Sequence, residues 1–190
     1  MLVSHSHKFM FFHPSRKTGG TSVAVALGHV SKDPYSDMHL RPSHVRTWMP
    51  DEFATYFKFA FVRNPWDRMV SCWSYDLMVT KKFQRGAVYY QMSFADYLQL
   101  RVVKQKGFWS SPQFNFLHDG EIELVNFTGR FESIQDDFDI ACGMVGVGKI
   151  MLPERRNTKH KHYSEYYDKA TKELVADVFA KDVEAYEYSF

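Results

Sequence analysis

Two short apolar runs, each followed by a polar turn and a helical pattern, limit the fold of this 190-residue chain more than any other feature. The first run is Lys8–His13, which Pro14 ends, and the second is Phe57–Val62. Such runs are typical of strands that are buried on both faces of a parallel sheet. Two strand–turn–helix units in succession predict an α/β fold, a three-layer domain with a central parallel sheet flanked by helices.

Helix and strand signals continue along the chain. Thr21 or Ser22 is expected to cap a helix that opens at Val23, because a hydroxyl accepts from the N–H groups of the first turn. Asn64 is expected to cap the second helix, with Pro65 as its first residue. The other expected elements are that helix from Trp66 to about Met78, a loop at Lys81–Gln91, a capping box at Ser93–Asp96, a strand at Glu121–Phe127, a helix at Ser133–Val145 with Ile134, Phe138, Ile140 and Ala141 inward, and a helix at Lys172–Tyr186.

Length and charge exclude several classes of protein. One domain over residues 1–190 is expected, because a single core spans about 100–200 residues. A net charge of +2 argues against general nucleic-acid binding but leaves room for a local site for a small polyanion. Cys72 and Cys142 are too few for a disulfide framework and are expected to be core thiols of a reducing compartment. Without an apolar run of about 18 residues, we expect a cytoplasmic protein that has no membrane partner.

The turn after the first strand, KTGGTS at 17–22, has the composition of a phosphate loop. Backbone N–H groups in such a turn point at an anion, and the following helix N-terminus adds positive potential. The turn supplies one cation, two glycines that let the backbone approach closely, and three hydroxyl groups: Lys17, Gly19, Gly20, Thr18, Thr21 and Ser22. The lysine precedes the glycines, so the turn is not a Walker A motif. Taken alone, the turn is equally consistent with a purely structural connection.

A second candidate for anion binding follows the second strand. Arg63 ends that strand, at the edge where α/β proteins bind ligands, and a guanidinium can hold a phosphate through two hydrogen bonds. Ser71 lies two helical turns after Asn64. The alternatives are a surface ion pair between Arg63 and Asp67 and a solvated or backbone-bonded hydroxyl at Ser71.

Four segments in order along nearly the whole chain resemble the carbohydrate-type sulfotransferases. They are HPSRKTGGTS, YFKFAFVRNPWDRMVSCWSY, VNFTGRFESIQDDFDIAC and the tail that begins RRNTKHKHYSEYYDK, and the block FVRNPWDRMVS is the most specific. The family usually reads H-x-P-K-T before the glycines, whereas His13–Lys17 holds one extra residue. The resemblance implies a P-loop-like fold and 3′-phosphoadenosine 5′-phosphosulfate (PAPS) as the sulfuryl donor.

The resemblance also implies roles for single residues. It makes Lys17, Thr18, Gly19, Gly20, Thr21 and Ser22 the loop that binds the 5′-phosphosulfate. It makes Arg63 and Ser71 the ligands of the 3′-phosphate. Arg130 is a further candidate at the nucleotide, and an ion pair with Glu132 is the alternative.

Sulfuryl transfer to a hydroxyl needs a base for the acceptor proton and positive charge at the bridging oxygen of the leaving phosphate. Lysine suits the second task, which points to Lys17. Relatives often place a histidine between the phosphate loop and the arginine strand, just before a short helix. His39 matches that place best, with His44 as the second candidate and His13 as the third.

The remaining charged segments carry weaker signals. Histidine pairs at 5 and 7 and at 160 and 162 have no third ligand at a fixed spacing, so no metal is expected. The basic run Arg155–Lys161 is expected to be solvated, or to close over the nucleotide or meet an anionic acceptor.

The sequence therefore predicts a PAPS-dependent sulfotransferase whose acceptor is a hydroxyl group of a saccharide. Three alternatives stay open. A kinase-like phosphotransferase is disfavoured by the order of lysine and glycines and by the lack of an evident Mg²⁺-binding constellation. The others are a non-catalytic module that binds nucleotide or glycan, and an inactive relative.

Overall fold

The computed structural model describes residues 1–28, 39–83, 89, 91–105, 107, 111–154 and 160–190. The chain divides into two compact units. The first combines Met1–Arg63 with Gln113–Arg155, and the second combines Asn64–Pro112 with Arg156–Phe190. That residues 1–190 form a single domain stays a prediction.

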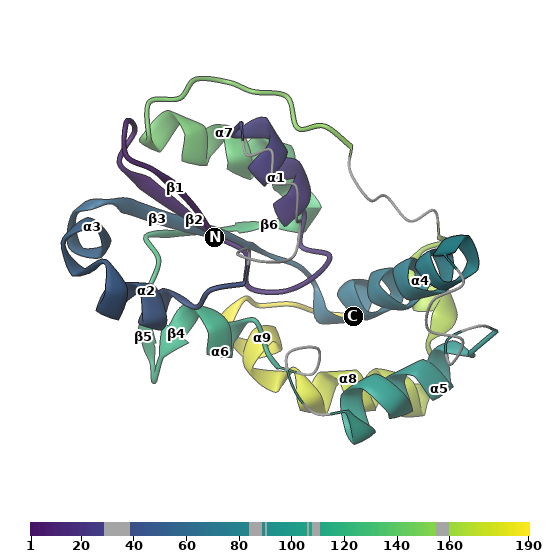
Figure 1. Ribbon diagram of the computed structural model, residues 1–190. Helices are drawn as coiled ribbons and strands as arrows, with labels where there is room; N and C mark the ends of the chain where they lie inside the picture. The colour runs from purple at the N-terminus through teal and green to yellow at the C-terminus, as the bar shows by residue number, and fades with distance from the viewer. Residues whose placement is uncertain (29–38, 84–88, 90, 106, 108–110, 155–159) are drawn as a thin grey trace. The chain divides into compact units, whose positions relative to one another are not determined.

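A four-stranded sheet of order β1-β2-β3-β6 is the centre of the first unit (Figure 1). Its strands are β1 (Leu2–Ser4), β2 (Phe9–Phe12), β3 (Phe57–Val62) and β6 (Phe127–Arg130). β1 runs antiparallel to β2, whereas β2, β3 and β6 are parallel. The predicted α/β fold, a mostly parallel sheet flanked by helices, is confirmed.

Phenylalanines of β2 and β3 form the core on one face of this sheet. Phe9, Phe11, Phe59 and Phe61 follow the period of two of a strand, and each is 1–2% exposed. The helices α1 (Gly20–Ala26) and α7 (Ile134–Met144) cover that face (Figure 1). Their residues in the cluster are Val23, Ala24, Phe138, Ala141 and Cys142.

The other face of the sheet carries α2 (Pro42–Trp48), α3 (Pro50–Thr55), α6 (Phe114–Leu117) and the hairpin of β4 (His118–Asp119) with β5 (Ile122–Glu123) (Figure 1). The buried Lys58 of β3 connects the sheet to α3. Its Nζ donates to the carbonyls of Phe53 (2.9 Å) and Tyr56 (2.8 Å), at the helix end where carbonyls lack intrahelical partners. Burial lowers the pKa of Lys58.

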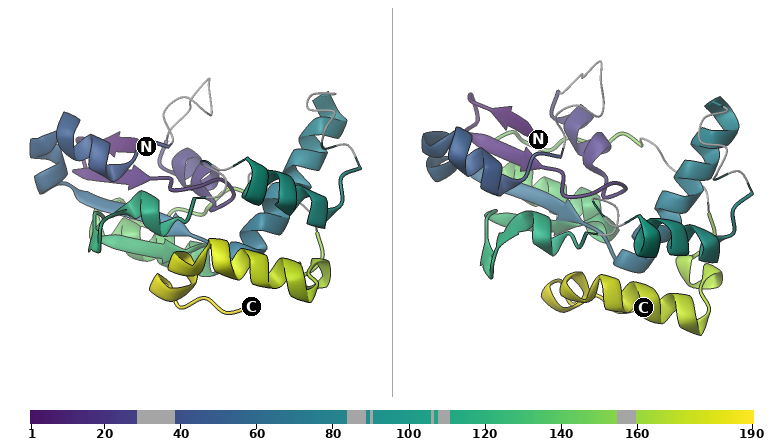
Figure 2. Two further views of the ribbon diagram at one scale, coloured as in Figure 1. Left: turned by 90° about the horizontal axis from the view of Figure 1, so that it is seen from below. Right: turned by 60° about the horizontal axis from the view of Figure 1, so that its bottom comes forward.

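The second unit is helical in all its described regular elements (Figure 2). They are α4 (Pro65–Phe83), α5 (Phe94–Leu98), a π-helical segment at Gln99–Lys104, a 3-10 turn at Tyr163–Tyr166, α8 (Lys169–Val178) and α9 (Ala180–Ala185). Asn64 and Ser93 are confirmed as side-chain caps: Asn64 Oδ1 accepts from the N–H of Trp66 at 3.0 Å, and Ser93 Oγ accepts from that of Asp96 at 3.1 Å. The Ser93 hydroxyl in turn donates to Asp96 Oδ2 at 2.6 Å, which is not the second bond of the predicted capping box.

Two predictions about helix ends and one about a loop are wrong. α1 begins at Gly20 with the left-handed Gly19 at its N-cap, and no described side chain caps it, so Thr21 and Ser22 lie inside the first turn. α4 continues through Phe83, three residues into the predicted loop, whose residues 84–88 and 90 lie outside the described residues. The predicted C-terminal helix is two helices, because Phe179 leaves the helical conformation between α8 and α9.

Two further expectations fail in the first unit. The segment Glu121–Phe127 is not one strand: Ile122 and Glu123 form β5, which pairs with the preceding β4 as a hairpin, and the parallel strand begins only at Phe127. The hairpin forms because Gly120, at φ 62°, supplies the left-handed conformation of a tight turn. Ile140 is 48% exposed, since α7 turns Phe138 and Ala141 to the sheet instead.

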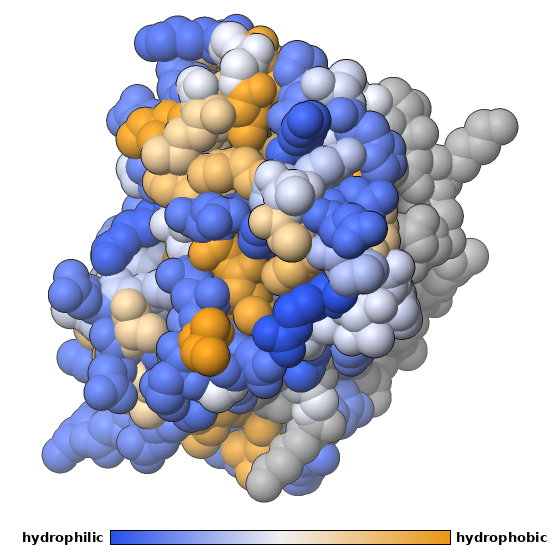
Figure 3. All heavy atoms as spheres, turned by 90° about the vertical axis from the view of Figure 1, so that its left-hand side faces the viewer, coloured by the Kyte–Doolittle hydropathy of each residue, from blue (hydrophilic) through white to orange (hydrophobic). Residues whose placement is uncertain are grey.

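Apolar side chains reach the surface between polar ones. Figure 3 shows apolar and polar residues side by side on the side of the molecule that lies at the left in Figure 1. The most exposed large apolar residues among those described are Met151 (81%), Ile122 (68%) and Trp48 (65%). Cys72 and Cys142 are buried free thiols, as expected. Within the described residues, no helix is both long and apolar enough to cross a membrane.

Candidate functional site

Three parallel strands of the first unit end at one edge of the sheet. In the register of the sheet, Phe12 pairs with Ala60 and Val62 pairs with Arg130. The next residues along β2 and β3 are His13 and Arg63, so their side chains start from this edge. The crevice outside the carboxyl ends of parallel strands is where α/β proteins bind ligands. The edge is therefore the candidate site, and the KTGGTS loop follows it directly after β2.

Two residues in the left-handed conformation bend the KTGGTS loop. Lys17 has φ 65° and Gly19 has φ 79°. The left-handed conformation costs an L-residue about 1–2 kcal/mol, so the surrounding structure must hold Lys17 in it. At Gly19 a side chain is also excluded by space, because a Cβ would lie 2.1 Å from Ile134 Cδ1 and 3.2 Å from Phe131 Cδ2. The turn between β6 and α7 thus supports the loop.

Gly20 makes room for the imidazole of His13. A Cβ at Gly20 would lie 1.5 Å from His13 Cδ2 and 2.1 Å from Nε2. The His13 side chain, 6% exposed, therefore lies directly against the first residue of α1. Both glycines of the loop are needed because protein atoms occupy the space of a side chain.

Backbone N–H groups are the hydrogen-bond donors of the loop that could bind an anion. The Thr18 hydroxyl donates to the carbonyl of Ser15 at 3.2 Å, inside the loop. The first intrahelical bond of α1 runs from the N–H of Val23 to the carbonyl of Gly19 at 3.2 Å. The N–H groups of residues 20–22 precede that bond and have no intrahelical acceptor. An anion at the loop would meet these N–H groups.

Arg63 is bound to the loop by its guanidinium. Its Nη1 donates to the carbonyl of Lys17 at 2.9 Å, and the guanidinium lies 3.9 Å from the centre of the Phe131 ring. Arg63 is 6% exposed and therefore lies in the interior of the protein, not on its surface. The structure thus brings together two predicted site residues, Lys17 and Arg63, that are 46 positions apart.

A buried glutamine fixes the backbone of Arg63. Gln113 is fully buried, and its Oε1 accepts from the N–H of Arg63 at 3.0 Å while its Nε2 donates to the carbonyl at 2.9 Å. Gln113, and also Phe131 beneath the guanidinium, were not predicted from the sequence. Phe131 could have been suspected as the aromatic residue that follows the third parallel strand. Gln113 has no local signal, because its partner lies 50 residues away.

The other two predicted nucleotide ligands are Arg130 and Ser71. Arg130 ends β6 beside Val62, and its N–H donates to Asp137 Oδ2 at 2.6 Å, an oxygen that also accepts from Ser133 Oγ. Its side chain is half-buried. Ser71 lies on α4 in the second unit and is 2% exposed. Its role beside Arg63 stays a prediction.

The three candidate histidines have different surroundings. His39 Nδ1 lies 3.2 Å from His13 Nδ1 and 3.1 Å from the His13 carbonyl oxygen, and the ring centres are 4.8 Å apart. Burial lowers the pKa of His39, the bond to the His13 carbonyl opposes this shift, and the N-terminal amine and Arg16 add to it. His44 is exposed on α2, with its ring 6.0 Å from that of Trp48. The structure thus joins two of the three candidates and separates the third.

Acid is expected to destabilise the protein through His39. Its pKa in the unfolded chain is about 6.5, and burial holds the folded value below that. Between the two values the unfolded chain binds more protons, so the contribution is complete above about pH 6.5 and is lost as the pH falls further. We expect the Tm of the wild type to drop more than that of His39→Gln between about pH 7.5 and about pH 5.5. Thermal unfolding followed by circular dichroism tests this, and equal drops would contradict it.

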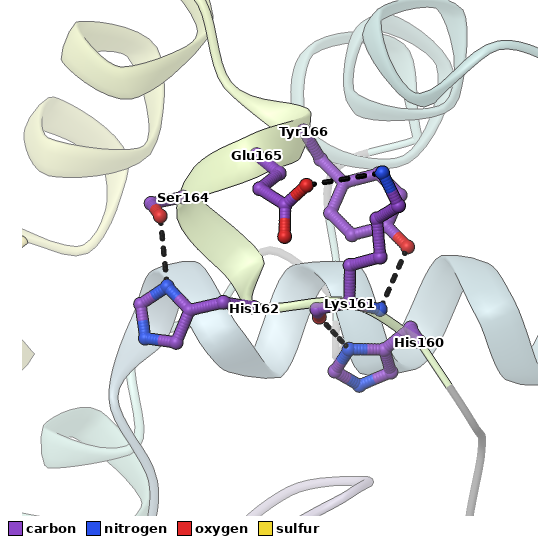
Figure 4. A network of polar contacts seen from close by, with 6 residues as sticks. All are labelled: His160, Lys161, His162, Ser164, Glu165 and Tyr166. Carbon is purple, nitrogen blue, oxygen red and sulfur yellow. Dashed lines mark hydrogen bonds and ion pairs between the residues drawn. The ribbon is translucent and has the colours of Figure 1, made fainter.

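The paired histidines near the C-terminus bond within their own segment (Figure 4). His160 Nδ1 donates to the carbonyl oxygen of Lys161 at 2.8 Å, and His162 Nδ1 lies 2.7 Å from Ser164 Oγ. Lys161 pairs with Glu165 at 3.1 Å. Among the described residues, no three His, Cys, Asp or Glu side chains are grouped as a metal site requires. Residues 155–159 of the predicted basic run lie outside the described residues.

Comparison with known proteins adds one finding. The chain matches the family model described as the sulfotransferase family over residues 1–189, which is all but its last residue. The match spans both units and every predicted site residue. No curated protein matches the chain.

Proposed function

The chain belongs to the sulfotransferase family, and from this premise we propose that it moves a sulfuryl group from PAPS to the hydroxyl of a saccharide. The single observation that carries the proposal is the bond between Arg63 Nη1 and the Lys17 carbonyl, which joins the two cationic residues at the end of the parallel strands. The resemblance of the four segments to carbohydrate-type enzymes supports PAPS as the donor and a saccharide as the acceptor.

The loop has the donors that a phosphosulfate requires. Lys17 supplies the positive charge, and the N–H groups of residues 20–22 precede the first bond of α1. Because Gly19 and Gly20 carry no side chain, Ile134, Phe131 and His13 can pack directly against this backbone and hold it in place. We assign Thr18, Thr21 and Ser22 to the same loop, with the backbone N–H of Thr18 as its donor, since its hydroxyl already bonds to Ser15.

Arg63 is assigned to the 3′-phosphate, with Ser71 as the second ligand and Arg130 as a further cation. The guanidinium of Arg63 has its plane supported by Phe131 and its backbone held by Gln113. A guanidinium fixed in this way loses little conformational freedom when it binds phosphate.

The transfer follows from these assignments as an in-line displacement. The acceptor oxygen forms a bond to sulfur as the bond between sulfur and the bridging oxygen breaks, and the electron pair of that bond stays on the phosphate. Lys17 stabilises the charge that grows on this oxygen. His39 takes the proton that leaves the acceptor hydroxyl, because its lowered pKa keeps the imidazole neutral at pH 7. Adenosine 3′,5′-bisphosphate is the second product.

A nucleotide panel separates this function from a kinase-like one. Ligands that bind only the native state raise its stability. We expect adenosine 3′,5′-bisphosphate to raise the Tm clearly and ATP with Mg²⁺ to raise it little. A larger shift with ATP and Mg²⁺ would favour phosphoryl transfer. Nucleotide stabilisation without turnover on a panel of saccharides would favour the binding module or the inactive relative.

Arg63→Ala is expected to weaken binding of adenosine 3′,5′-bisphosphate by about 1.5–3 kcal/mol, the usual range for a hydrogen bond to a charged group. Titration calorimetry with the bisphosphate and with adenosine 5′-phosphate distinguishes two roles of this residue. Loss of a 3′-phosphate contact weakens only the bisphosphate, whereas loss of loop support through Lys17 weakens both ligands. Arg46→Ala is the control, because Arg46 is exposed and pairs with Asp119. An unchanged preference for the bisphosphate in Arg63→Ala would overturn the assignment.

A further inference from the structure

One imidazole lies between the KTGGTS loop and His39. The Cδ2–Nε2 edge of His13 is against Gly20, so close that a Cβ there would lie 1.5 Å from Cδ2. The Nδ1 atom of His13 is 3.2 Å from Nδ1 of His39. The position of His39 relative to the loop is therefore set through the ring of His13, which is 6% exposed and is held in place by its surroundings.

The partners of His39 determine which of its nitrogens carries the proton. Its Nδ1 lies 3.1 Å from the carbonyl oxygen of His13, and a carbonyl oxygen only accepts hydrogen bonds. Nδ1 of His39 must therefore be the protonated nitrogen, and in the neutral ring Nε2 then has the lone pair. The same N–H faces Nδ1 of His13, which completes the contact only as an acceptor. His13 is then neutral and protonated on Nε2, at the edge that meets the loop.

We propose that His13 is a positioning residue: its carbonyl and its Nδ1 lone pair hold His39 as the Nδ1–H tautomer, with Nε2 as the nitrogen that takes the acceptor proton. This role rests on the proposed function, which identifies the proton as that of the acceptor hydroxyl. When the acceptor O–H bond breaks and the N–H bond forms at Nε2, His39 becomes a cation whose Nδ1–H donates to two acceptors. His13 stabilises that cation without taking the proton itself.

The charged groups around the pair show why a neutral partner matters. The N-terminal amine and Arg16 both disfavour a positive charge on His39, and burial disfavours it more strongly. The Nδ1 lone pair of His13 and its carbonyl act in the opposite direction. Protonation of His13 on Nδ1 would place two N–H groups 3.2 Å apart, so the pair holds at most one added proton.

The tautomers can be read by NMR in the full chain labelled with ¹⁵N-histidine. Near neutral pH we expect His39 to be protonated on Nδ1 and His13 on Nε2, as long-range ¹H–¹⁵N spectra report. Assignment uses His39→Gln and His13→Asn, each of which removes one set of signals. A His39 ring protonated on Nε2, or a His13 ring protonated on Nδ1, would overturn the proposal. This readout needs no turnover, so it can fail or succeed separately from the proposed function.

Two substitutions of His13 then test the side-chain lone pair. The amide oxygen of His13→Asn can accept in place of Nδ1, whereas His13→Leu has no acceptor. We expect His13→Leu to lower the pKa of His39 and to reduce kcat about tenfold, the effect of one hydrogen bond, while His13→Asn recovers most of both. His118→Leu is the control, since His118 is a half-buried histidine of the first unit whose Nδ1 donates to the carbonyl of Phe114 at 3.1 Å.

Binding of adenosine 3′,5′-bisphosphate and the circular dichroism spectrum show whether each variant is folded. Equal losses in His13→Asn and His13→Leu would mean that only the packing of the ring matters and would overturn the acceptor role. An unchanged His39 pKa in a folded His13→Leu would overturn it as well. If the tautomers and pKa values agree with the proposal but His39→Ala retains full turnover, the pair is real and the assignment of the base is wrong.

Discussion

Lys17→Met is expected to lower the rate of sulfuryl transfer by about 10²–10³-fold, the effect of removing one preorganised contact to a developing charge. The affinity for adenosine 3′,5′-bisphosphate is expected to change far less. The ammonium group gains interaction mainly as negative charge grows on the bridging oxygen, so its contribution belongs to the transition state. The backbone of Lys17, which bonds to Arg63 through its carbonyl, stays in place in this variant.

Single-turnover rates and nucleotide titration together test this expectation. Lys8→Met is the matched control, because Lys8 is also a left-handed lysine of the first unit, with φ 50°, but is exposed in the turn between β1 and β2. A variant that loses binding and turnover in equal measure would show that Lys17 anchors only the ground state. Full turnover in Lys17→Met would remove it from the mechanism.

Local signals predicted the frame of the site. The aromatic run at Phe57–Val62 forms β3 with the predicted bounds. Asn64 and Ser93 cap their helices as expected. These features depend on neighbours within a few residues, which the sequence shows directly. The loop also lies where predicted, because it follows a parallel strand and a parallel strand has a defined carboxyl end.

Long-range contacts explain what the sequence analysis did not predict. The N-cap of α1 is the left-handed Gly19, and a glycine is needed there because Ile134 and Phe131 also occupy the space of a side chain. Ile134 lies 115 positions further along the chain, so no local pattern shows the contact. The alternating segment Glu121–Phe127 suggested one strand, but Gly120 lets its beginning fold back on β4.

Arg63 can serve both the KTGGTS loop and the 3′-phosphate position of the proposed site. Its guanidinium donates to the loop through the Lys17 carbonyl, while Gln113 holds its backbone. A guanidinium has five N–H donors in a planar fork, so a bond to the loop leaves the group able to bind an anion as well. The same residue can therefore set the position of Lys17 and contact the 3′-phosphate.

His39→Ala is expected to reduce turnover by about 10²-fold or more, the contribution of a general base, while binding of adenosine 3′,5′-bisphosphate stays near that of the wild type. A hydroxyl is a poor nucleophile until a base takes its proton, and no other candidate combines the features of His39. It is held against His13, next to the loop, and its pKa is lowered by burial. His44→Ala is expected to retain most activity, because that ring is exposed on α2.

The decisive experiment compares both variants in transfer from PAPS to a saccharide that the wild type sulfates, with nucleotide titration alongside. The pH profile adds a second test: the lowered pKa of His39 predicts that the acid limb of kcat lies below pH 6.5 in the wild type. If His44→Ala is the inactive variant, the base lies on α2 and the pair at His13 has another role. If neither variant loses activity while both bind nucleotide, His13 itself becomes the remaining histidine at the loop, and His13→Asn, which cannot take a proton, is then the variant that must be inactive.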